Sequence, residues 1–201
     1  MSRAIDTLMN EHRVILSVLG SLENYVSQGQ QGTTLDRYIL GDYVEFFRNF
    51  ADKCHHGKEE ELLFRKMNDY GFSNDAGPLA VMLGEHVQGR DHVRALAAIA
   101  AGTGPVSAAD QIRAIQHALG FIFLLRNHIG KEDQILFPMA MQYIPGEELD
   151  QLHEAFESYE INVMGAETHA RFHHLAEKLV ATYPPSQNSG VSQCTHFCNH
   201  S

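Results

Sequence analysis

The sequence has no tryptophan, only three cysteines and no run of 18 apolar residues. A membrane-spanning helix needs about 20 predominantly apolar residues, so the sequence predicts none. The cysteines (Cys54, Cys194 and Cys198) are too few for a disulfide framework in a chain of 201 residues. The initial segment MSRAIDTLMNEH also lacks the apolar region of a secretory signal, so we expect a reducing, cytoplasmic location.

Positive charge is scarce as well. There are 15 lysines and arginines against 25 aspartates and glutamates, which gives a formal net charge of −10. Nucleic acids and anionic membrane surfaces attract basic proteins, so neither is an expected partner. No segment alternates apolar and polar residues for long enough to suggest a sheet.

Apolar residues recur instead at helical spacing, in five segments separated by short turns. We therefore predict an all-α protein built on an antiparallel, up-down four-helix bundle. The expected organisation is the bundle in residues 1–145, one additional C-terminal helix packed on it in 146–183, and a flexible tail in 184–201. The five helices are expected at about residues 2–27, 35–70, 78–101, 108–143 and 151–183.

One ten-residue stretch occurs twice: HHGKEEELLF at 55–64 and HIGKEDQILF at 128–137. Each copy contains a His-x-x-x-Glu pair, which a helix places on one face, one turn apart. The repeat extends to an earlier helix, because His12 lies 43 residues before His55 and His86 lies 42 residues before His128. Both early histidines follow a glutamate and lie within an apolar stripe. A duplicated helix pair of this kind predicts a bundle with approximate two-fold symmetry and inward-facing ligands.

The predicted metal ligands are four imidazoles and two carboxylates: His12, His55, Glu59, His86, His128 and Glu132. Burying so many titratable groups without a metal would be costly. This donor set suits iron, manganese or zinc. Two carboxylates that can each bridge through both oxygens indicate a pair of ions, usually about 3.5–4 Å apart. Six side chains cannot fill two octahedra, so positions remain for a bridging oxide and a small ligand.

The pattern H…HxxxE…H…HxxxE resembles that of the hemerythrin-like (HHE cation-binding) family of bacterial type, over about residues 5–141. The resemblance implies a bundle holding two non-haem iron ions, oxo- or hydroxo-bridged, on the six residues above. Oxygen-carrying members have a fifth histidine four residues after the one in the third helix, where this chain has Arg90. Arg90 could pair with a bridging glutamate or a bound anion, or could extend to solvent at the bundle edge.

Three further features are open to interpretation. His56 and Glu60 offer an alternative register, but the second copy of the repeat has Ile129 and Asp133 there, so the symmetry favours His55 and Glu59. Cys54 adjoins a predicted ligand and is expected to serve packing. The tail contains soft donors that could bind zinc or copper, or could remain flexible: Cys194, His196, Cys198 and His200.

The expected function is that of a non-haem di-iron protein that binds or reacts with O2, H2O2 or NO. If it is an enzyme, it is an oxidoreductase acting on one of these molecules, with a role in oxidative or nitrosative stress. The alternative is a non-enzymatic module that binds or senses oxygen or iron, or that handles iron under stress. A structural bundle holding zinc or no metal is the third possibility.

Overall fold

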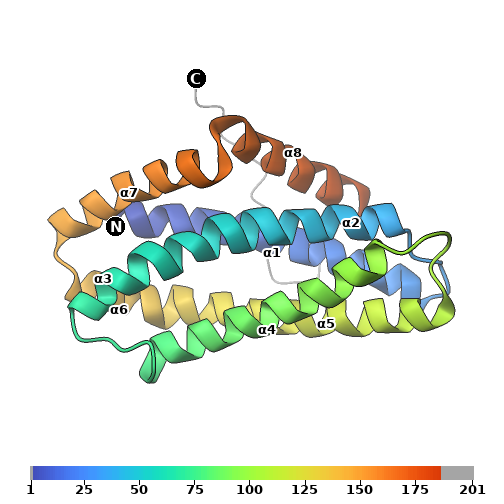
Figure 1. Cartoon of the computed structure of the whole chain (residues 1–201), viewed down its shortest axis with the longest axis horizontal. Coiled ribbons are helices and arrows are strands. Elements are labelled where there is room, and N and C mark those ends of the chain that lie inside the picture. The colour runs from blue at the N-terminus through green and yellow to red at the C-terminus, as the bar shows by residue number, and fades with distance from the viewer. Residues whose placement is uncertain (1, 187–201) are drawn as a thin grey trace.

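The computed structural model describes residues 2–186, which form a helical bundle without a strand in that range (Figure 1). Four antiparallel rods make up the bundle, as the sequence predicts. Two of the rods contain π-helical segments, labelled η, in which the turn is wider than in an α-helix. The rods are α1 (Arg3–Gln30); α2 (Arg37–Phe46), η1 (Phe47–His56), η2 (Glu59–Leu63) and α3 (Phe64–Asp69); α4 (Gly77–Ala100); and α5 (Ala108–Lys131), η3 (Glu132–Leu136) and α6 (Phe137–Tyr143).

Local sequence signals fix where the rods begin and end. Asp36 caps α2, since its side chain accepts hydrogen bonds from the backbone N–H groups of Tyr38 and Ile39. Ser107 caps α5 in the same way, since its side chain accepts a hydrogen bond from the backbone N–H of Asp110. Gly71 follows α3 with a φ of +88°, a conformation that suits glycine and ends the rod.

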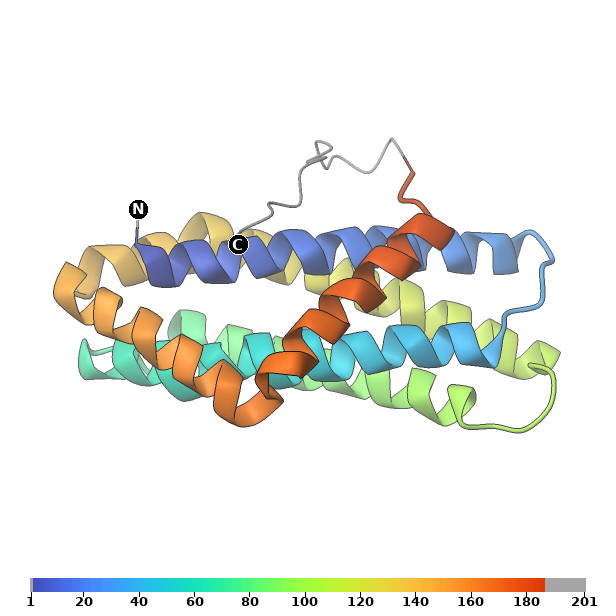
Figure 2. The same ribbon diagram turned by 90° about the horizontal axis from the view of Figure 1, so that it is seen from above.

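The C-terminal segment differs from the expected single helix over 151–183. It forms two helices, α7 (Gly146–Met164) and α8 (Ala166–Thr182), because Gly165 adopts a φ of +77° between them. The chain turns there, and α8 crosses obliquely over α1 and α2 (Figure 2). Buried hydrogen bonds fix α8 in place, with Ser21 donating to the carbonyl of Leu179 over 2.8 Å. The tail residues with soft donors lie outside the described residues.

The apolar core consists of two clusters rather than one. The first includes Ile15, Cys54 and Ile129, and the second includes Leu8, Leu63 and Leu136. In each rod the histidines and glutamates of the repeat lie between residues of the two clusters. The bundle therefore has a polar layer across its middle, closed on both sides by packed apolar side chains. None of the helices within residues 2–186 is long and apolar enough to cross a membrane.

Candidate metal centre

The polar layer contains five histidines and two glutamates, all directed into the bundle. Their exposed fractions are 0–1%, except for His56 at 6%. α1 provides His12, α4 provides His86, α5 provides His128, and the π segments provide the other four side chains. The latter are His55, His56, Glu59 and Glu132. All six predicted ligands are thus brought together, and His56 joins them.

The donor atoms fall into two compact groups that share Glu59. One group is His12, His55, Glu59 and Glu132; the other is His56, Glu59, His86 and His128. Within each group the donor atoms all lie within 4.8 Å of one another. Such a cluster has the dimensions of a two-ion site with a shared carboxylate.

Both glutamates reach across the two groups. Glu132 places one oxygen 3.2 Å from Nε2 of His12 and the other 3.2 Å from Nε2 of His128. Glu59 does the same with His55, at 3.5 Å, and His86, at 3.6 Å. Metal ions of this kind bind nitrogen and oxygen donors at about 2.0–2.2 Å, so two ligands of one ion lie about 3.0–3.5 Å apart. The observed separations are therefore those between neighbouring ligands of an ion.

The buried carboxylates lack other partners. All four oxygens of Glu59 and Glu132, and Nε2 of His12, accept or donate no hydrogen bond within the described part of the chain. Leaving such groups unpaired in a protein interior is expensive. Metal cations between them would satisfy all of these atoms at once, so the residues present fit bound metal.

Each of the five histidines has its Nδ1 atom hydrogen-bonded to a carboxylate. The pairs are His12 with Asp133 at 2.7 Å, His55 with Glu11 at 2.8 Å, His56 with Asp52 at 3.4 Å, His86 with Glu60 at 2.7 Å, and His128 with Glu85 at 2.9 Å. A carboxylate only accepts, so Nδ1 is the donor and carries a proton. In a neutral imidazole this leaves the lone pair on Nε2, which faces the centre, as in metal-bound histidines generally.

Basic side chains balance these outer carboxylates. Lys58, which is fully buried, pairs with Glu11, and Lys131 pairs with Glu85. The two pairs occupy equivalent places in the repeat, so the duplication includes the outer contacts as well as the inner donors. These outer pairs can be recognised in the sequence, because a glutamate precedes both His12 and His86 and a lysine precedes both Glu59 and Glu132.

The adjacent residues His55 and His56 both face inward because of the local helix geometry. In an α-helix neighbouring side chains point about 100° apart. η1 ends at His56, and its wider turn reduces that angle. The two histidines are therefore not alternatives in this structure: each joins a different group.

Glu60 and Arg90 both lie outside the two groups. Nδ1 of His86 donates to Glu60, so the register that would pair His56 with Glu60 does not form. Arg90 pairs with Glu60 and Asp52, at 2.7 Å each, and with neither of the inner glutamates. Its side chain is 34% exposed, so it spans the boundary between the centre and the surface.

Burial and charge separate the pKa values of the histidines in the absence of metal. Burial lowers the pKa of His56 to about 3, and it also lowers those of His55 and His86. Burial opposes protonation of His12 too, but the hydrogen bond to Asp133 and the adjacent carboxylate of Glu132 raise its pKa to about 10. The charge of Glu132 similarly overcomes burial at His128 and raises its pKa to about 9.

Comparison with known proteins agrees with this geometry. The family description "Hemerythrin HHE cation binding domain" matches residues 3–140. The chain belongs to this family. Domains of the hemerythrin HHE family bind metal cations, typically iron, and the buried histidines and glutamates described above are the groups available to do so.

The matching relatives are uncharacterized proteins of Mycobacterium bovis and of two strains of Mycobacterium tuberculosis. Each is 26% identical over 160 residues, which cover 78% of this chain and 61% of the relative. The HHE chain thus spans about three fifths of the length of the curated relatives it matches. No solved structure matches the chain.

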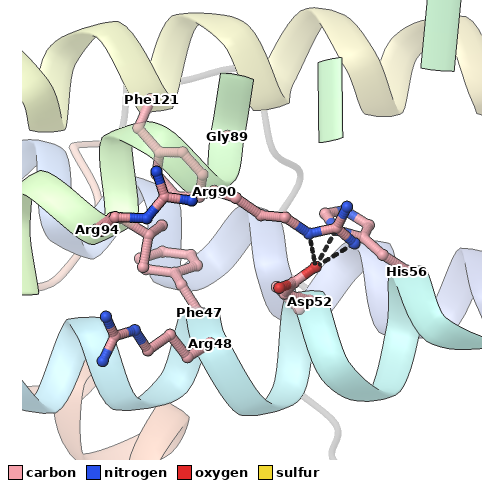
Figure 3. Close-up of a pocket in the computed structure, with 10 residues that line it drawn as sticks. Phe47, Arg48, Asp52, His56, Gly89, Arg90, Arg94 and Phe121 are labelled. Atoms are coloured by element: carbon pink, nitrogen blue, oxygen red, sulfur yellow. Dashed lines mark hydrogen bonds and ion pairs between the residues drawn. The ribbon is translucent and has the colours of Figure 1, made fainter. Parts of the chain in front are cut away.

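One part of this HHE domain breaks the two-fold symmetry. Asp52, His56 and Arg90 form a connected set on one side of the centre. By the offset of the repeat, the equivalent residues are apolar: Leu125, Ile129 and Leu16. A cavity of about 220 Å³ lies on the polar side, with all three polar residues in its wall (Figure 3). The two halves of the centre therefore differ in donor number and in surroundings.

Proposed function

We propose that the chain is a non-haem di-iron protein whose centre binds and reacts with a small diatomic or peroxide ligand: O2, H2O2 or NO. The observation that supports this most directly is that Glu59 and Glu132 each offer one oxygen to each of the two donor groups. Carboxylates in that position bridge two ions. Nitrogen and carboxylate donors, without a thiolate in either group, suit iron.

In this proposal the two ions have unequal ligand sets. His12 and His55 would hold one ion, and His56, His86 and His128 the other, with both glutamates shared. The first set has four protein donors and the second has five, so open positions differ in number between the two ions. His56 would supply the fifth imidazole that the third helix lacks. Bound iron would supply the one-electron redox chemistry that O2, peroxide and NO require.

The protein residues have three tasks at such a centre. The outer carboxylates hold each Nε2 atom toward the ions, the two apolar clusters keep the layer dry, and Lys58 and Lys131 compensate the outer charges. The cavity beside His56 would give small molecules access to that side of the centre. Cys54 is buried and unpaired, which is consistent with a reducing, cytoplasmic location.

Metal analysis and absorption spectroscopy of the purified protein test this proposal. About two iron ions per chain are expected, with near-ultraviolet bands that change on addition of azide, peroxide or NO. A colourless protein containing only zinc, or no metal, with an unchanging spectrum would overturn it. Peroxide consumption at many turnovers per chain would indicate an enzyme, whereas reversible spectral changes without turnover would favour the carrier or sensor alternative.

A further inference from the structure

The cavity beside His56 has the composition of a binding site for a small organic acid. Two phenylalanines, Phe47 and Phe121, lie in its wall with Ala51, Gly89 and Val93. Three arginines complete the wall with Asp52 and His56. The cavity is smaller than the usual range of about 300–1,000 Å³ for drug-sized ligands. Its volume therefore suits a molecule of only a few carbon atoms or a single ring.

The register of the two antiparallel rods places the arginines. His56 stacks on His86 with ring centroids 3.9 Å apart, and one turn along, Asp52 pairs with Arg90. One further turn in the same direction brings Arg48 opposite Arg94. Figure 3 shows these two guanidinium groups at one end of the lining residues, and the contact between Arg90 and Asp52 at the other.

The two ends of the cavity differ in charge. At the inner end, Asp52 and Glu60 more than neutralise Arg90, so no positive charge is left for a ligand. At the outer end, Arg94 contacts only the exposed carboxylate of Asp91 on its own helix, at 2.6 Å. Arg48 is exposed and forms no hydrogen bond or ion pair with any residue in the range 2–186. An anion bound at this end would interact favourably with both guanidinium charges.

Gly89 keeps the middle of the cavity open. A methyl group on Gly89 would meet Phe121 at 3.5 Å and Leu124 at 3.9 Å, both ordinary contacts. Packing therefore does not require glycine here, although glycine is a much weaker helix former than alanine. The space that it leaves is cavity volume between the phenylalanines and the rod that carries His56.

From these features we propose that the cavity binds a small monocarboxylate with an apolar body. The carboxylate pairs with Arg48 and Arg94, and the apolar body lies against Phe47 and Phe121, beside Gly89. The neutralised inner end accepts an uncharged group and rejects a second carboxylate. This site goes beyond the proposed function, and its occupation does not require iron.

Titration calorimetry with phenylacetate tests this proposal, and its neutral analogue phenylacetamide serves as the comparison. Both probes are titrated into the protein as isolated and into the protein after chelator treatment. Phenylacetate is expected to bind both forms, and phenylacetamide about tenfold or more weakly, one lost charge pair being worth about 1.4 kcal/mol or more. Arg48→Ala with Arg94→Ala should remove the preference for the anion. Arg113→Ala, which changes an exposed arginine on α5, should leave binding unchanged.

Gly89→Leu should abolish binding of both probes, and Gly89→Ala should weaken it less. The arginine variants are at exposed positions and keep the test valid if Gly89→Leu does not fold. The proposal would be overturned if phenylacetate showed no saturable binding, or if the double arginine variant bound phenylacetate as tightly as the unchanged protein does. Binding that appears only in the iron-loaded form, with a change in the iron spectrum, would show direct coordination and would also overturn it. A protein without iron that still binds phenylacetate would refute the proposed function alone.

Discussion

His55 and His56 are consecutive in the chain, yet their imidazoles belong to opposite halves of one buried cluster. The ring of His55 lies 4.6 Å from that of His12, whereas the ring of His56 stacks on that of His86 at 3.9 Å. Their own centroids are 5.6 Å apart. The wider π-helical turn of η1 lets both imidazoles face inward, so a single helical segment supplies a donor to each proposed ion.

Replacing either histidine should therefore affect a different ion. We expect His55→Ala and His56→Ala each to lower the metal content from about two to about one ion per chain, measured by elemental analysis after dialysis. His117→Ala is a suitable control, since its ring contacts His92 and neither donor group. Retention of both ions by His56→Ala would show that this histidine is not a ligand.

Glu59 and Glu60 provide a second adjacent pair with different tasks. Glu59→Gln removes a carboxylate whose oxygens both face the centre, so loss of both ions is expected. Glu60→Gln removes only the charge behind His86, and metal affinity should fall about 10–100-fold, the usual effect of an outer partner. Competition with a chelator measures both affinities. Equal losses in the two variants would contradict the distinction.

Metal binding should release protons at neutral pH. Without metal, His12 has a pKa of about 10 and His128 a pKa of about 9, so both are protonated at pH 7. An ion needs the Nε2 lone pair, so loading displaces at least about two protons per chain. Apparent affinity should then rise with pH and level off above about pH 10. Calorimetry of anaerobic Fe(II) binding, repeated in buffers of different ionisation enthalpy, counts the protons released. An affinity for Fe(II) that does not change with pH would contradict the protonated state of His12 and His128.

Gly57 and Gly130 form a matched pair across the repeat. An added methyl group at Gly57 would overlap the hydroxyl of Tyr159 on α7, whereas at Gly130 it would meet nothing within 4 Å. Gly130→Ala should stabilise the fold by up to about 1 kcal/mol through helix propensity. Gly57→Ala should instead lower the free energy of unfolding by about 1–3 kcal/mol, because the methyl group overpacks against α7. Urea unfolding measures both changes. In the double variant Gly57→Ala, Tyr159→Ala, the destabilisation by the added methyl group should disappear. If it remained, contact with Tyr159 would not be its cause.

The Cys54 thiol should be inert in the folded protein. Its exposed fraction is 1%, and burial raises its pKa to about 12, so almost no reactive thiolate exists at pH 8. In a Cys194→Ser, Cys198→Ser variant, which keeps only this cysteine, a thiol reagent should react fully only after unfolding. Rapid labelling of the folded variant would show that the core between η1 and α7 opens readily.

The sequence by itself determined the helical class, the bundle and six of the seven inward donors, for a physical reason. His12 and His86 each occur at the 3.6-residue spacing of the apolar residues around them, so a helix places both on its buried face. The duplication then specifies two equivalent halves. Even the outer pairs repeat, as Glu11 with Lys58 and Glu85 with Lys131. The start of α5 could also be read from local chemistry, since Ser107 satisfies a free N–H group of that helix.

Only the tertiary structure decided the features that a regular helical period does not predict. The π-helical turn that brings His56 inward depends on hydrogen bonding along a packed helix, which periodicity assumes to be α-helical. The partners of Arg90 lie 30 and 38 residues away on a facing rod, so only the register between rods fixes them. The break at Gly165 was hidden because a glycine is tolerated within a helix, and packing of α8 across the bundle selects the turn instead. The asymmetric cavity combines these effects, since it exists only where two packed rods place polar side chains opposite one another.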